Sequence, residues 1–159
     1  MSILLLSICT IMPTTLSMSK YEIRNACRYE KKILKEAHQH GIDPYLLASL
    51  IYVESNFRPH VVSRAGACGL TQVIPKWTGS LETRGKKYTC EQLKNPDTAI
   101  SVGARILSYV TTVYAKGNID KGLCYYNAGT KCITRQGFYK RLYYVKKVRQ
   151  IHNKIKRSL

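Results

Sequence analysis

The sequence predicts a mainly α-helical protein with a single domain. Apolar residues recur at helical spacing in several segments, strong start and stop signals separate those segments, and neither an internal repeat nor a low-complexity tract is present. A chain of 159 residues is long enough for one hydrophobic core and too short to need two domains. We therefore expect one globular unit behind a short leader.

The expected leader is the uncharged segment 1–19. Its apolar run, Ile3–Met12, ends at Pro13 and is too short to cross a membrane, which takes ~20 apolar residues. Ser17 and Ser19 are small residues at the positions that decide signal cleavage, although the usual positive charges are missing. We expect 1–19 to be a signal peptide, with a retained anchor or a mis-assigned start as alternatives, and 20–159 to form the domain.

The cysteines indicate disulfide bonds rather than a metal. Cleavage of the leader would remove Cys9, and an exported chain would keep disulfides. The simplest count is then two bridges and one odd thiol, with the short loops Cys68–Cys90 and Cys124–Cys132 as the first pairs to test. Zinc is the weaker alternative, because no CxxC spacing occurs and the four histidines are scattered. We expect neither a metal nor a cofactor.

The first two predicted helices are the most clearly bounded. Apolar positions recur at helical spacing over 22–38, and Gly41 should end that helix. Asp43 followed by Pro44 is a strong start signal for the next helix, since Asp can cap free N–H groups and Pro fits the first turn. That helix is apolar on nearly every side up to Val53, so we expect it to be central and buried.

The second half of the chain predicts a loop region and three more helices. Segment 55–75 reads as loop and short turns, and a polar, irregular stretch continues to Lys94. Asn95 should then open a helix, and Asp120 should cap a shorter one that ends near Gly129. The buried stripe of the former would comprise Ala99, Ile100, Gly103, Ile106, Leu107, Val110 and Val113. The terminal helix would bury Tyr144, Val148, Ile151 and Ile155.

Glu54 is the candidate catalytic residue. It stands at the end of the apolar helix, where desolvation and the negative end of the helix dipole both disfavour its anion. A pKa raised toward ~6 or 7 would let a glutamic acid protonate a glycosidic oxygen near neutral pH. The alternative is an ordinary helix-end carboxylate in a salt bridge.

A second carboxylate, which most glycosidases require, is not evident. Asp43 precedes Glu54 by 11 residues, roughly 16 Å along a helix, and so cannot be its partner. Glu82, Glu91 and Asp97 would qualify only if folding brought them back. A single carboxylate can serve if it acts first as acid and then as base.

Four motifs in order make the sequence recognisable. These are Glu54–Phe57 followed by Ser63, Gly66–Pro75, Asn95–Pro96, and Tyr125–Gly129. In order and spacing they resemble the catalytic domain of soluble lytic transglycosylases, over about Tyr29 to Val148. The resemblance implies a goose-type lysozyme-like fold with a central buried helix and an irregular loop or small hairpin region.

The resemblance also implies a reaction and a set of site residues. Peptidoglycan would be cleaved without water between N-acetylmuramic acid and N-acetylglucosamine, with Glu54 as acid and then base, leaving a 1,6-anhydro ring. By the same resemblance, the substrate-binding positions would be Ser63, Gln72, Ile74, Tyr126 and Asn127. Gly66 and Gly69 would shape the loop.

The sequence departs from the family pattern at two positions. Thr71 stands where methionine is usual and should make the cleft floor more polar. Cys68 lies inside the loop, either tied to Cys90 or free. Trp77 would cover the rim of the cleft or serve only for packing.

The net charge of +17 indicates an anionic partner or surface. No acidic residue follows Asp120, and the last helix is rich in Lys and Arg. That helix is either a solvated basic face or a surface for anionic wall polymers or the outer membrane.

Rival interpretations are a hydrolytic goose-type lysozyme, a cationic membrane-active protein and a nucleic-acid-binding module. Nucleic acid is disfavoured because it explains neither Glu54 nor the ordered motifs. We expect an exported monomer, periplasmic, extracellular or virion-borne, that opens the wall for a phage or for a secretion machine.

Overall fold

The computed structural model describes the backbone of residues 7–159, without the side chains of 133, 135 and 137–140. The α-helices are α1 (Ile8–Thr15), α2 (Lys20–His40), α3 (Pro44–Ser55), α4 (Cys90–Lys94), α5 (Pro96–Tyr109), α6 (Ile119–Ala128) and α7 (Arg135–Arg157). Short segments are η1 (Pro75–Trp77), η2 (Leu81–Thr83), the π-helix η3 (Val110–Tyr114) and η4 (Gly129–Ile133). The prediction of a mainly helical domain is confirmed.

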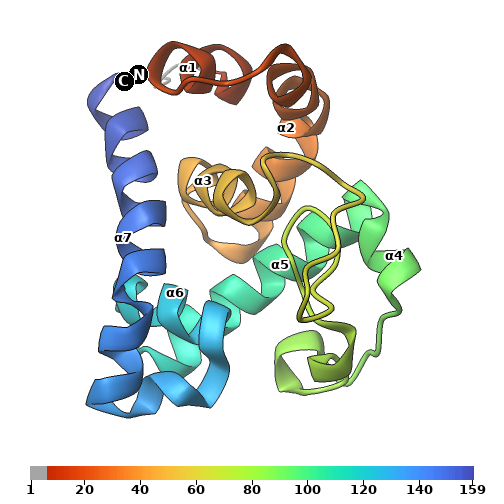
Figure 1. Cartoon of the computed structure of the whole chain (residues 1–159), viewed down its shortest axis with the longest axis vertical. Helices are drawn as coiled ribbons and strands as arrows, with labels where there is room; N and C mark the ends of the chain where they lie inside the picture. Colours follow the sequence, from red (N-terminus) through yellow and green to blue (C-terminus); the bar gives the residue numbers. More distant parts are fainter. Residues whose placement is uncertain (1–6) are drawn as a thin grey trace.

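Helix α3 forms the centre of the molecule. Figure 1 shows it enclosed by α2, α5 and α7, with α7 running along one side of the protein. Its side chains are buried around the whole helix, as predicted from its unbroken apolar sequence: Tyr45, Leu46, Leu47, Ala48, Ser49, Leu50, Ile51 and Ser55. Because α3 is buried on all sides, the residues at its two ends are held in fixed positions.

The predicted boundaries of α2 and α3 are confirmed. Gly41 ends α2 in the left-handed region at φ 64°, and the Asp43 carboxylate accepts a hydrogen bond from the backbone N–H of Tyr45, with Pro44 in the first turn. A capping box between Ser19 and Glu22 starts α2 at Lys20.

Helix α1 is part of the core. Ile8 and Met12 are fully buried, and the Glu30 carboxylate accepts hydrogen bonds from the Ile8 N–H at 2.7 Å and the Ser7 hydroxyl at 2.9 Å. Pro13 lies inside the helix and does not end the apolar run, contrary to the sequence expectation. Removal of 1–19 stays a prediction, and it would take these contacts away. No helix within residues 7–159 is long and apolar enough to cross a membrane.

All six cysteines are paired. The predicted bridges Cys68–Cys90 and Cys124–Cys132 are confirmed. In the full chain Cys27 of α2 is bonded to Cys9 of α1. The odd thiol was expected for a chain without its leader and stays a prediction; by this pairing it would be Cys27. Cys68–Cys90 ties the loop that follows α3 to the start of α4.

Three local predictions are wrong. Residues 90–94 form a helix because Thr89 and Gln92 make a capping box, in a segment too short to show apolar periodicity. The cap of α6 is Asn118, which leaves Asp120 in the first turn, where it pairs with Arg149 at 3.1 Å. Val113 is exposed because the π-helix η3 rotates it off the buried stripe of α5.

Candidate active site

Glu54 lies in the last turn of α3, where the chain leaves the core. The next residue, Ser55, is buried and its hydroxyl lies within hydrogen-bond distance of the Ile51 carbonyl at 3.1 Å and the Leu70 carbonyl at 2.8 Å. Asn56 then ends the helix in the left-handed region at φ 52°. These bonds join the end of α3 to the loop and fix the backbone from which Glu54 projects.

The carboxyl of Glu54 is held by a phenol from the far end of the chain. Tyr144 of α7 donates its hydroxyl to Glu54 Oε1 at 2.5 Å. Burial raises the pKa of Glu54 to about 7, while the Tyr144 hydrogen bond and the charge of Lys147 act in the opposite direction. The elevated pKa predicted from sequence is confirmed, and burial is its main cause. Near neutral pH the group is present in both its protonated and its ionised form.

Tyr126 of α6 is a second tyrosine near Glu54. Its hydroxyl donates to the Thr71 carbonyl at 2.8 Å, and burial together with the nearby Glu54 charge raises the pKa of the phenol. Two tyrosines, from α6 and α7, therefore lie near the single carboxyl at the end of α3.

Thr71 supports this arrangement from within the core. It is fully buried, and its hydroxyl donates to the Ala99 carbonyl at 2.8 Å. The expectation of a more polar cleft floor is therefore wrong, because the hydroxyl faces α5. Gly103 makes room for it, since a Cβ there would lie 2.5 Å from the Thr71 Cβ.

The loop residues Ser63 and Gln72 make contacts within the loop itself. Ser63 Oγ accepts a hydrogen bond from the Ala67 N–H at 3.0 Å, and Gln72 Nε2 donates to the Val61 and Gly69 carbonyls, both at 3.0 Å. Gly66 and Gly69 have positive φ values of 81° and 76°, as loop-shaping glycines should. A Cβ at Gly69 would lie 1.8 Å from the Leu93 carbonyl oxygen, so this glycine permits close packing against α4.

The remaining predicted residues lie at the surface of the region. Ile74 is half-buried and precedes η1, and Asn127 is exposed in the last turn of α6. Trp77 is 68% exposed, with Lys76 Nζ 5.3 Å from its ring centroid, which excludes packing in the core. The contact that sequence reasoning missed is that of Tyr144, whose helical spacing predicted burial only.

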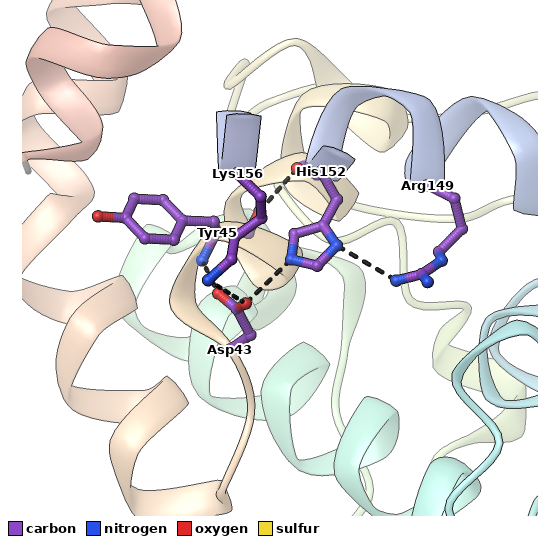
Figure 2. A network of polar contacts seen from close by, with 6 residues as sticks. Asp43, Tyr45, Arg149, His152 and Lys156 are labelled. Atoms are coloured by element: carbon purple, nitrogen blue, oxygen red, sulfur yellow. Dashed lines mark hydrogen bonds and ion pairs between the residues drawn. The ribbon is translucent and has the colours of Figure 1, made fainter. Parts of the chain in front are cut away.

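Asp43, Glu82 and Glu91 are engaged elsewhere. Asp43, at the opposite end of α3, contacts His152 at 3.0 Å (Figure 2). Glu82 accepts the Tyr114 hydroxyl at 2.8 Å, and Glu91 pairs with Lys94 at 2.6 Å. Within the described part of the chain, no carboxylate contacts Glu54, and no group of three or more His, Cys, Asp or Glu residues is placed to hold a metal ion.

Most of the chain is similar to a known protein family. Residues 31–146 match the family described as Transglycosylase SLT domain. The chain belongs to this family. The matched segment includes Glu54, Tyr126 and Tyr144.

Two relatives illustrate the match. The chain is 42% identical over 73 residues to an endo-type membrane-bound lytic murein transglycosylase A of Klebsiella pneumoniae, covering 43% of this chain and 36% of that protein. It is 31% identical over 124 residues to a membrane-bound lytic murein transglycosylase C of Glaesserella parasuis, covering 72% of this chain and 34% of that protein. The chain thus spans about a third of the length of these relatives.

Solved structures share the fold. The 70 kDa soluble lytic transglycosylase of Escherichia coli superposes with a TM-score of 0.69 at 23% identity, covering 80% of this chain and 24% of that one. The lytic transglycosylase Slt of Pseudomonas aeruginosa gives a TM-score of 0.64 at 24% identity, covering 84% of this chain and 24% of that one. The helices around α3 therefore have the arrangement seen in that fold.

Proposed function

We propose that the protein is a peptidoglycan lytic transglycosylase in which Glu54 is the single acid and base. The observation that carries this proposal is the half-buried Glu54 carboxyl, with a pKa of about 7 and a hydrogen bond from Tyr144, in a chain of the SLT family. A group with that pKa can both donate and accept a proton near neutral pH.

The reaction needs one proton in each direction. Protonated Glu54 donates its proton to the oxygen that links the muramyl and glucosaminyl sugars, and the bond from that oxygen to the muramyl C1 breaks. The resulting carboxylate then takes the proton of the muramyl C6 hydroxyl while that oxygen bonds to C1. The products are a 1,6-anhydromuramyl end and a free glucosaminyl hydroxyl, with no water consumed and Glu54 again protonated.

The neighbouring tyrosines support this cycle by position. We assign Tyr144 the role of holding the Glu54 carboxyl in one orientation through both steps. Tyr126 and Asn127 would contact the substrate beside Glu54. Ser63 and Gln72 keep the loop in shape through their own hydrogen bonds, and with Ile74 they would line the cleft.

The proposed setting is the cell wall outside the cytoplasm, reached by export or carried by a virion. Three disulfides suit an oxidising compartment. The wall itself is the proposed partner, with the basic outer face of α7 resting on anionic wall polymers or the outer membrane. Local wall opening for a phage or a secretion machine is the corresponding role.

The products of digestion test the proposal. Purified peptidoglycan is digested with the wild-type protein and with Glu54→Gln, and the released muropeptides are analysed by mass spectrometry. We expect 1,6-anhydro ends from the wild type and none from the variant. Reducing ends would establish the hydrolytic lysozyme instead, and equal release by both proteins would refute the role of Glu54.

A further inference from the structure

A pocket of about 330 Å³, separate from the Glu54 site, lies where η2 packs on α5. Its walls come from the end of α2, from η2 and its C-cap, and from α5 with the start of η3: His40, Leu81, Glu82, Arg84, Arg105, Ser108, Tyr109 and Thr112. None of these is a residue of the Glu54 site.

The pocket lies on the opposite side of α5 from that site. Gly103 faces Thr71 and the catalytic loop. At 100° per residue, Arg105 and Ser108 project about 200° and 140° around the helix from Gly103. A helix about 10 Å thick therefore separates the two sites.

Two arginines give the pocket its charge. Within the described residues, neither Arg84 nor Arg105 makes an ion pair. The protein has 26 basic and only 9 acidic residues, so many basic groups lack an acidic partner. Burial and the charges of Arg105 and Arg84 lower the pKa of the His40 imidazole, while the Glu36 carboxylate 3.6 Å away acts in the opposite direction. The pocket thus has two guanidinium groups without an ion pair beside the His40 imidazole.

The backbone around the pocket is unusual at two points. Arg84 has a φ of 53°, in the left-handed region that favours glycine, and this conformation projects its side chain at the end of η2. The π-helix η3 starts directly after Tyr109 and carries Thr112 in the pocket wall. Strained residues and π-helical turns are concentrated at functional sites in proteins.

Glu82 sets the kind of ligand that fits. Glu82 also lines the pocket, and its carboxylate accepts the Tyr114 hydroxyl at 2.8 Å, so one acidic group accompanies the two arginines. A ligand with a carboxylate for the arginines and an amine for Glu82 would satisfy both charges, and Tyr109 offers an aromatic ring beside them.

We propose that this pocket binds the free carboxylate and amine of a short acidic peptide. This rests on the proposed function, because the peptides that the wall glycan carries have both groups. Since α5 separates the pocket from Glu54, the bound peptide would hold the enzyme on the wall and would take no part in bond cleavage.

Direct titration tests the pocket by itself. A stem tetrapeptide released from peptidoglycan by an amidase is titrated into the wild type and into Arg84→Ala, Arg105→Ala, Glu54→Gln and Arg157→Ala. Arg84 is exposed, so its loss leaves the fold intact, and Arg157 is an exposed arginine at the end of α7 that serves as the matched control. We expect at least about tenfold weaker binding in the two pocket variants, since each loses a charge-assisted hydrogen bond. Binding by Glu54→Gln and Arg157→Ala should equal that of the wild type.

Equal binding by all five proteins, or tighter binding of inorganic phosphate than of the peptide, would overturn the proposal. Cleavage assays separate it from the proposed function. Arg84→Ala should cleave intact sacculi more slowly than the wild type does. It should cleave peptide-free glycan strands at the wild-type rate. A wild type that binds the peptide and cleaves neither substrate would refute the proposed function alone.

Discussion

The two ends of α3 carry carboxylates in opposite electrostatic conditions. Asp43, before the first turn, has a pKa lowered to about 2, and Glu54, in the last turn, has a pKa raised to about 7. Both contact the same helix, α7. Asp43 meets His152 and Lys156 of that helix (Figure 2), whereas Glu54 meets the uncharged hydroxyl of Tyr144.

The difference lies in what surrounds each group. Burial raises the pKa of both, but at Asp43 the His152 hydrogen bond, the Tyr45 N–H and the charge of Lys156 outweigh it. Because a guanidinium can only donate, Arg149 at 3.2 Å makes His152 Nδ1 the acceptor and leaves its Nε2–H to donate to Asp43. Glu54 has one phenol and a more distant lysine. One end of the helix is thereby a structural anchor and the other a proton carrier.

The largest expected effect is a difference in wall-cleavage rate between variants at the two ends of α3. Glu54→Gln should lower the rate of wall cleavage by about 10³-fold or more, since the amide cannot exchange a proton. Asp43→Asn should leave the rate per folded molecule within about twofold, because it lies at the far end of α3. Release of soluble muropeptides measures both. A matching loss of rate in the two variants would remove the distinction.

The next effect concerns stability above pH 4.5. The folded-state pKa of Glu54, about 7, exceeds its ordinary value of 4.5, so the folded protein binds the proton more tightly and loses stability as pH rises from 4.5 through 7. A shift of this size corresponds to about 3 kcal/mol at most. Glu54→Gln should therefore be more stable than wild type at pH 8, as measured by urea unfolding. A variant less stable than wild type at that pH would contradict the buried-carboxyl account.

Asp43 should have the opposite pH dependence. Its folded-state pKa, about 2, is below its ordinary value of 3.8, so its contribution is complete above pH 3.8 and is lost as pH falls through 2. The loss amounts to about 2 kcal/mol. Asp43→Asn should lack this acid-induced decrease, which thermal unfolding between pH 2 and 5 would measure. An unchanged decrease in the variant would assign it to other carboxylates.

The smallest effect tests the contact between Tyr144 and Glu54. Tyr144→Phe removes a hydrogen bond that lowers the pKa of Glu54, so the pKa should rise above 7 and the alkaline limb of the pH–rate profile should move upward. Turnover should decrease about tenfold because the carboxyl loses its orienting partner. Tyr126→Phe is the matched control, since its hydroxyl bonds the Thr71 carbonyl and not Glu54. The same pH shift in both variants would remove the specific role of Tyr144.

The sequence predicted the parts of this comparison that depend on local signals. Asp43 with Pro44 marks a helix start, and an unbroken apolar run marks a buried helix with Glu54 at its end, so both carboxylates could be placed 11 residues apart. The raised pKa of Glu54 was predicted from its expected burial and from the negative end of the helix dipole. The family motifs indicated Tyr126 as a site residue but did not show what its side chain contacts.

What the sequence could not give depends on packing between distant segments. Tyr144 lies 90 residues from Glu54, and nothing local distinguishes it from any other residue of a buried stripe. The same is true of Cys27, whose partner lies in a segment that resembles a leader, and of Val113, which the π-helix turns outward. For Tyr144 and Cys27 the deciding contact is tertiary, whereas for Val113 it is a local change of helix type.

The most direct test of the central claim is the titration of Glu54 itself. Carbon-13 NMR of the glutamate carboxyl groups, with Glu54→Gln to assign the signal, follows each group from pH 3 to 9. We expect one glutamate that titrates near pH 7 in the wild type and is missing from the variant. A Glu54 signal that titrates at its ordinary value of 4.5 would contradict the account, since the group would then hold no proton to donate at neutral pH.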